Sequence, residues 1–485
     1  MEYASSLDHY ANIKRDPSLQ DIPDLEGESA DDRNRRICAA LPKTDIGNGD
    51  RFVARYAKEF CFIRGKGWAW FNGTCWSTVN ARERALECAK EVAQSIQSEH
   101  WRRASQALPR LKAMLECAET RLSRDLSDFD QDDAAIGIEN GVLRITRSSD
   151  GVALTCSDMR AEDNITRTLR VAYDPEALCP IWIAHMERLH PDKEMRDFVQ
   201  RLLGYCLLGT TRQQEMFIFH GRGGDGKSTT VNVLARIMGD YAQPLDVLAL
   251  IATGLTRNAD AASPTLARLA GDVRLAYTSE PPSKGRLNEG FIKLLTGGSA
   301  ITARHNYQDP IEFQPRCKIL LECNTLPKIE GTDDGIWRRI VVVPWDVQIP
   351  KHEMDFDLEA KLSEEASGIL NWLLQGALAY LKRGLDQPPR VKEASAVYRK
   401  SSDSLGGWVQ ERLERNGTYT ELQGALLADY RTYCAQRGLA AMRPKDFTAK
   451  LSQYGLVRSD RNHPTMRKPY WIGGRLPVSD AASAG

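Results

Sequence analysis

The sequence predicts an α/β protein built on a parallel sheet, with a mainly helical region before it and a small basic unit after it. Between residues 215 and 385, short β-rich runs alternate with helical segments, which is typical of parallel strands covered by helices on both faces. The expected strands are MFIFH (216–220), VRLAYT (273–278), KILLEC (318–323) and IVVVPW (340–345). A glycine-rich segment directly follows the first of these strands.

A length of 485 residues suggests roughly three domains. Residues 16–32 carry seven acidic and no basic side chains, so residues 1–43 are expected to form a flexible acidic leader. The predicted divisions that follow are an N-terminal region at 44–208, the sheet domain at 209–385, and a C-terminal unit at 386–485. The 65 basic and 65 acidic side chains balance, so any nucleic-acid contact has to come from local basic patches.

Several classes of protein are disfavoured. The N-terminus lacks the apolar core of a signal peptide, and the longest uncharged apolar stretch, residues 366–381, is shorter than the roughly 20 residues that cross a bilayer. The 11 cysteines include no CxxC pair, which indicates reduced, mostly buried thiols rather than a zinc site. We therefore expect a cytoplasmic protein without a membrane partner.

A phosphate-binding loop is predicted at residues 221–228, where GRGGDGKS matches the pattern GxxxxGK[ST] between an apolar strand and a helical run. Glycines let backbone N–H groups curl around phosphate oxygens, and the N-terminus of the next helix attracts the same anion. Lys227 is expected to reach the β and γ phosphates, and the Ser228 hydroxyl is expected to ligate Mg²⁺. The predicted nucleotide-binding residues are Gly221, Gly223, Gly224, Asp225, Gly226, Lys227, Ser228 and Thr229.

Other candidate catalytic residues follow later strands. Glu280, at the end of the second strand, is the candidate for facing Mg²⁺ and polarising water, with Glu289 next in line. Asn324, after the third strand, could sense the γ phosphate, and Arg338 and Arg339 could project into a neighbouring subunit's nucleotide. Each also has an ordinary interpretation: a solvated glutamate, a turn-forming asparagine, and surface arginines in ion pairs.

Together these segments resemble the superfamily 3 helicases, specifically the phage/plasmid primase and poxvirus primase-helicase group. The resemblance covers about residues 44–385 and rests on GRGGDGKST, TSEPPSKGRLNEGFIKLLTGGSAITARHNYQDPIEFQP, KILLECNTLPKIEGTDDGIWRRIVVVPW and GILNWLLQGALAYL. Upstream, TDIGNGDRFV, GWAWFNGTCW, IENGVLRI, YDPEALCPIW and LLGYCLLGTTRQQ look like the helicase-associated region of that group.

The resemblance implies an AAA+-like P-loop NTPase motor domain and assigns roles within it. It places Glu280 in the second acidic motif, makes Asn324 the sensor, and favours Arg339 over Arg338 as the arginine finger. It also implies a DNA-contacting hairpin whose basic members are Lys293, Arg304 and His305. The chain departs from the group at two positions, with Asp225 where asparagine is frequent and Ser299 where aspartate is frequent.

The C-terminal tail is basic, because residues 437–475 hold nine basic and two acidic side chains. A helix at RPKDFTAKLSQYGL followed by a two-stranded wing at LVRSDRNHPTMRKPYWIG suggests a winged-helix-like module that contacts DNA. Its expected contact residues are Lys445, Lys450, Arg467 and Lys468. The plain alternative is a small packing domain whose charges are only solvated.

The expected function is that of an ATP- and Mg²⁺-dependent helicase of a phage, plasmid or other mobile element, acting on single-stranded or forked DNA in replication. A hexameric ring is expected, together with a separate primase and polymerase, since only about forty mostly acidic residues precede the resemblance. Two rivals remain: an ATP-gated origin-binding protein that does not unwind DNA, and a monomeric P-loop kinase of a small molecule.

Overall fold

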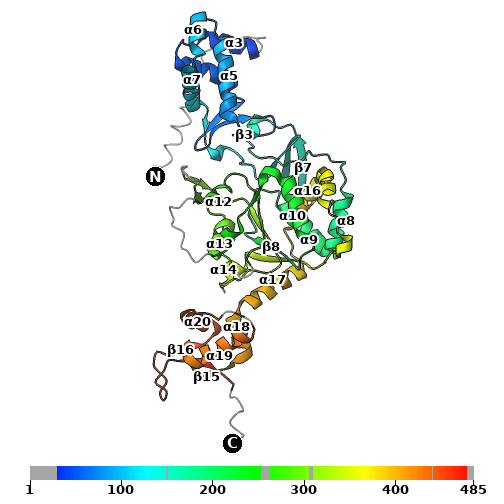
Figure 1. The fold of residues 1–485 in the computed structure, drawn as a ribbon, viewed down its shortest axis with the longest axis vertical. Helices are drawn as coiled ribbons and strands as arrows, with labels where there is room; N and C mark the ends of the chain where they lie inside the picture. The colour runs from blue at the N-terminus through cyan, green and yellow to red at the C-terminus, as the bar shows by residue number, and fades with distance from the viewer. Residues whose placement is uncertain are drawn as a thin grey trace.

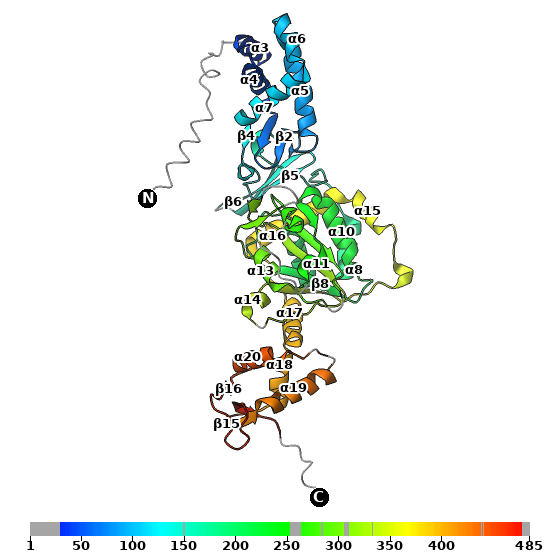
Figure 2. The ribbon, with the colours of Figure 1, turned by 60° about the vertical axis from the view of Figure 1, so that its left-hand side comes forward.

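The computed structural model describes residues 30–148, 151–252, 263–282, 285–304, 310–331, 333–437, 439 and 441–477. A group of N-terminal helices lies at one end of the molecule, an α/β unit at its centre and a small unit of helices and strands at the other end (Figure 1). Helix α17, Pro389–Ser402, connects the central unit to the C-terminal one, and a view turned by 60° shows the same order (Figure 2). Within the described residues, no helix combines the length and the apolar character needed to cross a bilayer.

The central unit contains a five-stranded sheet in the order β14-β8-β13-β10-β9, and every neighbouring pair is parallel. The four predicted strands are confirmed, and the short edge strand β9 adds a fifth that was not predicted. The bounds are β8 Met216–Gly221, β9 Ala242–Pro244, β10 Leu275–Ser279, β13 Lys318–Cys323 and β14 Ile340–Trp345.

Alternate side chains of these strands enter two different hydrophobic cores, one on each face of the sheet. On one face, Phe217 and Phe219 pack with helices α8 Pro180–Leu189, α9 Lys193–Tyr205, α10 Lys227–Met238 and α16 Ala366–Arg383. On the other, Met216 and Ile218 pack with α11 Val247–Leu250, α12 Pro264–Ala267, α13 Glu289–Thr296 and α14 Asp334–Trp337. The near-continuous apolar strands are explained by this burial on both faces.

The core that contains Phe217 and Phe219 includes residues on both sides of the predicted domain boundary at 208/209. The boundary itself stays a prediction. Helices α8 and α9 and the antiparallel strands β5 Ala135–Ile138, β6 Gly141–Ser148 and β7 Gly151–Ser157 contribute side chains to this core or border it. Helices α9 and α16 pack very closely. A Cβ atom on Gly204 of α9 would lie 2.2 Å from a backbone atom of α16, and one on Gly376 of α16 would lie 2.0 Å from a backbone atom of α9. Residues on both sides of 208 therefore form one packed body.

The N-terminal helices lie next to their own small core, formed by residues between Phe52 and Leu122. They are α3 Ala30–Ala40, α4 Asp45–Tyr56, α5 Ala81–Ser95, α6 Glu99–Ser105 and α7 Leu108–Arg121, next to a sheet of β1 Phe60–Ile63, β2 Gly67–Phe71, β3 Trp76–Ser77 and β4 Ser123–Arg124. The prediction of a flexible leader at residues 1–43 is wrong for residues 30–40, because they form helix α3 and Ile37 is buried. Residues 1–29 lie outside the described residues.

The C-terminal unit has a separate hydrophobic core around Trp408, Tyr430 and Phe447. Its helices are α18 Ser404–Arg412, α19 Gln423–Gln436 and α20 Pro444–Leu451. Its antiparallel sheet has the order β15-β17-β16, formed by β15 Glu414–Leu422, β16 Val457–Arg458 and β17 Tyr470–Arg475.

A buried arginine joins the start of β10 to the preceding region. The Arg274 side chain is 1% exposed, forms an ion pair with Asp272, and donates to the backbone oxygens of Leu207 and Ala135 at 2.5 and 2.6 Å. These bonds satisfy the guanidinium in a place that water does not reach.

We expect Arg274→Met to lower the free energy of unfolding by about 3–5 kcal/mol, because it leaves the buried Asp272 carboxylate with only the more distant Arg316, at 3.7 Å, as a cation. Arg286→Met is the control, since its ion pair with Glu330 is exposed and should contribute only about 0.2–1 kcal/mol. Urea unfolding of both variants measures the difference, and equal losses would contradict the structural role of Arg274.

Candidate nucleotide site

The predicted phosphate-binding loop connects the end of β8 to the start of α10, as the sequence pattern requires. Gly223, Gly224 and Gly226 all have positive φ angles, of 90°, 65° and 73°, which side-chain-bearing residues rarely adopt. The segment after β14 holds the loop in place, because the N–H of Ile349 donates to the Gly224 oxygen at 2.7 Å. These backbone conformations and this hydrogen bond together fix the shape of the loop.

Inside the loop, Lys227 is paired with Asp225. Lys227 Nζ donates to Asp225 Oδ2 at 2.5 Å, and both residues are 4% exposed. The Gly223 N–H donates to the same carboxylate oxygen at 3.1 Å. The Asp225 carboxylate thus binds the Lys227 ammonium and a backbone N–H group, which are the kinds of group that bind phosphate in such loops.

Asn324 connects the loop to the end of the neighbouring strand. Its Oδ1 accepts a hydrogen bond from Lys227 Nζ at 3.1 Å, and its Nδ2 donates to Glu280 Oε1 at 2.9 Å. Glu280 follows β10 with a φ of 46°, a conformation that costs energy for a non-glycine residue and is found often at functional sites. The structure therefore brings together Lys227, Asn324 and Glu280, three side chains that the sequence places far apart.

Glu322 is a residue of this site that the sequence analysis missed. It lies within β13, is 4% exposed, and its Oε2 accepts a hydrogen bond from the exposed Ser228 hydroxyl at 2.8 Å. Burial raises the pKa of its carboxyl, opposed by the Ser228 hydrogen bond and by the positive charge of Lys227. One signal could have identified it: a lone glutamate inside the apolar run KILLEC.

The donor set suits Mg²⁺, which prefers hard oxygen ligands and usually takes only one or two carboxylates together with substrate phosphates. Ser228, Glu280 and Glu322 provide a hydroxyl and two carboxylates near the loop. Within the described residues, no group of three or more His, Cys, Asp or Glu side chains is arranged to hold a metal by itself. Glu289, the second candidate acid, instead accepts from the backbone N–H groups of Glu330 and Gly331 at 3.1 and 2.6 Å.

The two predicted arginines lie in different environments. Arg339 is buried, where its Nε donates to Thr296 Oγ1 at 3.0 Å and its Nη1 donates to the Gly335 oxygen at 2.5 Å. Arg338 beside it is exposed. This placement does not fit the preference for Arg339 as a residue that reaches another subunit, because its guanidinium is already bound within its own chain.

The predicted DNA-contacting residues are only partly described. Strands β11 Ile301–Ala303 and β12 Ile311–Phe313 pair antiparallel, and His305 lies between them, outside the described residues. Lys293 forms an ion pair with Asp333 at 3.2 Å, and the backbone oxygen of Arg304 accepts from Ser263. In the C-terminal unit, Lys445, Arg467 and Lys468 are exposed, whereas Lys450 Nζ donates to the Glu330 oxygen at 2.6 Å.

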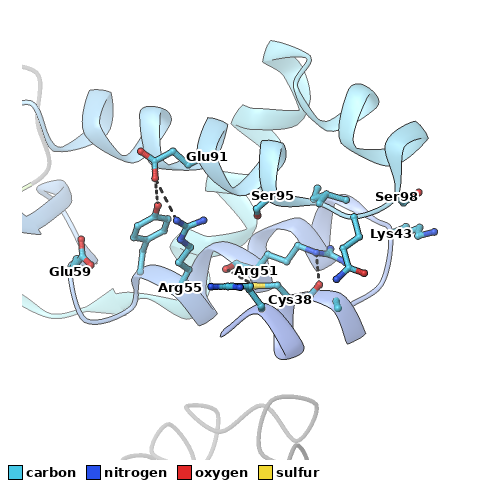
Figure 3. Close-up of a pocket in the computed structure, with 13 residues that line it drawn as sticks. Cys38, Lys43, Arg51, Arg55, Glu59, Glu91, Ser95 and Ser98 are labelled. Atoms are coloured by element: carbon cyan, nitrogen blue, oxygen red, sulfur yellow. Dashed lines mark hydrogen bonds and ion pairs between the residues drawn. The ribbon is translucent and has the colours of Figure 1, made fainter. Parts of the chain in front are cut away.

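A cavity of about 1150 Å³ lies elsewhere, among α3, α4 and α5. Figure 3 shows that several of its side chains already have partners. Tyr56 and Arg55 both approach Glu91, and Arg51 donates to the backbone oxygen of Cys38. Its size does not make it the nucleotide site, because it lacks the loop and the carboxylates described above.

Two known protein families match parts of the chain. Residues 49–190 match the family described as "D5 N terminal like", and residues 219–339 match the "Family of unknown function (DUF5906)". The predicted resemblance to the D5-like superfamily 3 group is confirmed. The second match covers the phosphate-binding loop, Glu280, Asn324 and both arginines.

Named relatives of the D5-like group come from viruses. "Putative helicase L207/L206" of Acanthamoeba polyphaga mimivirus is 32% identical over 320 residues, which cover 62% of this chain and 33% of that protein. "Putative helicase 022R" of Frog virus 3 is 28% identical over 252 residues, or 48% of this chain and 26% of that protein. The chain thus spans about a third or less of the length of these two curated relatives.

Among solved structures, the apo structure of the NrS-1 C terminal region is 13% identical and has a TM-score of 0.38, covering 62% of this chain and 77% of that one.

We expect Arg339→Ala to lower the free energy of unfolding by about 1.5–3 kcal/mol, the usual contribution of hydrogen bonds from a charged group. The neighbouring Arg338→Ala is the matched control and should change it by no more than about 0.5 kcal/mol, because that side chain is exposed. Thermal and urea unfolding give both values; a stable Arg339→Ala variant would contradict a structural role for this arginine.

Proposed function

We propose that this protein is an ATP-dependent, ring-forming DNA helicase of a phage, plasmid or other mobile element, acting in replication. The observation that carries the proposal is the continuous set of contacts from Asp225 through Lys227 and Asn324 to Glu280, at one edge of a parallel sheet. The names of the viral relatives agree with helicase function.

The residues suit hydrolysis of a phosphoanhydride more than simple nucleotide storage. Lys227 would stabilise negative charge on the β and γ phosphates, and the Ser228 hydroxyl would hold Mg²⁺, which neutralises the same oxygens when bound. Glu280 is exposed and its carboxylate is oriented by the Asn324 amide, so it could accept a proton from an attacking water. The amide of Asn324 contacts both Lys227 and Glu280, so it could report to Glu280 whether Lys227 is bound to phosphate.

We propose a ring, in which a neighbouring subunit would add a cation to those of the loop. We assign the arginine finger to Arg338 rather than Arg339, since only Arg338 is exposed. A finger supplied by a neighbouring subunit would stabilise charge that develops during hydrolysis. A hexamer is the ring size we propose.

DNA contact would come from two places. One is the β11–β12 hairpin, and the other is the C-terminal unit, whose element order α18-β15-α19-α20-β16-β17 supports a winged-helix-like fold. The exposed Lys445 lies on α20 and the exposed Arg467 and Lys468 lie between β16 and β17, where a recognition helix and a wing would contact phosphates. An origin-binding protein without unwinding activity is the second candidate, favoured by this same basic unit.

Strand displacement on 3′-tailed and 5′-tailed forks with ATP and Mg²⁺ tests the proposal. We expect unwinding by the wild-type protein and none by Lys227→Ala, which removes the cation facing phosphate but little packing. The control Lys445→Ala should keep ATP hydrolysis and lose DNA affinity. ATP-dependent DNA binding without strand displacement would favour the origin-binding alternative, and normal hydrolysis by Lys227→Ala would exclude this nucleotide site.

Asp225→Asn should bind ATP more tightly than the wild type, because the carboxylate competes with phosphate for Lys227 Nζ and the Gly223 N–H. We expect at least about a fivefold lower Kd, the factor that corresponds to roughly 1 kcal/mol. Titration with a fluorescent ATP analogue measures the constant. A weaker affinity would instead show that Asp225 orients Lys227 for phosphate and does not compete with it.

A further inference from the structure

The strand that ends in Glu280 provides only one carboxylate to the site. The residue before Glu280 is Ser279, and Thr278 precedes it, so a second acidic side chain is absent from the end of β10. A site that holds Mg²⁺ through a loop hydroxyl commonly needs a carboxylate close to that hydroxyl to orient it and to balance the metal's charge. Glu280 does not contact Ser228; its carboxylate bonds to Asn324.

Strand β13, next to β10 in the sheet, provides a carboxylate at the position along the strands where β10 has Ser279. Strands β10 and β13 run parallel with Ser279 and Glu322 as direct partners, so the two residues lie side by side across the sheet. The Glu322 carboxylate accepts the Ser228 hydroxyl at 2.8 Å, and the Glu322 backbone oxygen accepts the N–H of Glu280 at 2.9 Å. Glu322 therefore contacts the loop hydroxyl and also fixes the backbone of the candidate general base.

The surroundings of Glu322 favour binding of a cation. Its side chain is 4% exposed, and within the described residues its hydrogen-bond partner is a neutral hydroxyl rather than a lysine or arginine. The positive charge of Lys227 offsets this carboxylate only in part, because burial still raises its pKa, so a second cation in front of it would stabilise the charged form. Ser228 is exposed, so the position in front of both groups is accessible to a nucleotide-bound ion.

We propose that Glu322 is a positioning residue for Mg²⁺. Its carboxylate orients the Ser228 hydroxyl and a metal-bound water, a role for which the end of β10 offers only Ser279 at the paired position. This inference rests on the proposed function, since it concerns the same nucleotide site. Glu322 acts on the metal through Ser228 and through water, while Glu280 is left free to act on the attacking water.

The test compares nucleotide affinity with Mg²⁺ and with EDTA, so it does not depend on turnover. For the wild-type protein, Mg²⁺ should tighten binding of a non-hydrolysable ATP analogue. Glu322→Gln keeps the shape and can still accept the Ser228 hydrogen bond, so affinity in EDTA should stay unchanged while the tightening by Mg²⁺ falls by about tenfold or more. Glu116→Gln, an exposed glutamate on α7, is the matched control and should keep the full Mg²⁺ effect.

A structural role predicts a different pattern. If Glu322 only held the fold together, the glutamine variant would unfold at a lower temperature and bind nucleotide more weakly in both conditions, and this result would overturn the proposal. If that variant does not fold, Glu322→Asp carries the test, since it keeps the charge but withdraws it from Ser228 by one methylene. An undiminished Mg²⁺ effect in the aspartate variant would then overturn it.

A rescue variant adds a readout that packing alone does not change. Adding Ser279→Asp to Glu322→Gln places a carboxylate at the partner position on β10 and should restore part of the Mg²⁺ effect. No recovery would overturn the requirement for a carboxylate at this level. A failure of the proposed function is distinguishable, because the wild-type protein would then show no strand displacement, whereas this inference is tested by the Mg²⁺ effect on nucleotide affinity alone.

Discussion

The parallel register of β8, β13 and β10 is the constraint on which the site depends. Cys323 is the partner of His220, and Glu322 is the partner of Ser279, so the three strands end at nearly the same level. The residues that directly follow them emerge at one edge of the sheet, as is general in open α/β folds. Asn324 and Glu280 reach each other because of this alignment and because both sheet faces are fixed by large cores.

Electrostatics explains the order of charged and neutral side chains from Asp225 through Lys227 and Asn324 to Glu280. The ammonium of Lys227 is buried and would be costly alone, and the Asp225 carboxylate compensates it at 2.5 Å. The neutral amide of Asn324 then lies between Lys227 and Glu280, donating to the carboxylate and accepting from the ammonium. An amide can do both at once, whereas an acidic side chain there would repel Glu280 and a basic one would repel Lys227. These contacts hold the site in one arrangement, and phosphate binding would replace the Asp225 contact without rebuilding the rest.

The sequence predicted the elements whose signals are local. The glycine pattern located the loop, and the apolar runs located four strands, because both depend on neighbouring residues along the chain. It did not reveal Glu322, since whether a charged residue inside an apolar strand points into a site depends on pairing with distant strands. It also favoured Arg339 over Arg338, because position relative to a motif does not show which of two adjacent side chains is buried. The helix at residues 30–40 was missed because the acidic run at residues 16–32 overlaps its start; in the structure Ile37 is buried, α3 contacts α4, and the Arg51 side chain donates to the Cys38 backbone oxygen.

The burial of Arg339 gives that residue a mechanical role that a surface finger could not have. Its guanidinium connects Thr296, at the end of α13, to Gly335 in α14, and the Lys293 to Asp333 ion pair joins the same two segments. Helix α13 leads directly into the β11–β12 hairpin, while the exposed Arg338 directly follows α14. The proposed finger and the proposed DNA-contacting hairpin are therefore attached to one cross-linked body rather than to independent loops. If the proposed function holds, a subunit that shifts Arg338 on meeting a neighbour's nucleotide would move the hairpin with it, and this link would couple ATP hydrolysis to DNA movement.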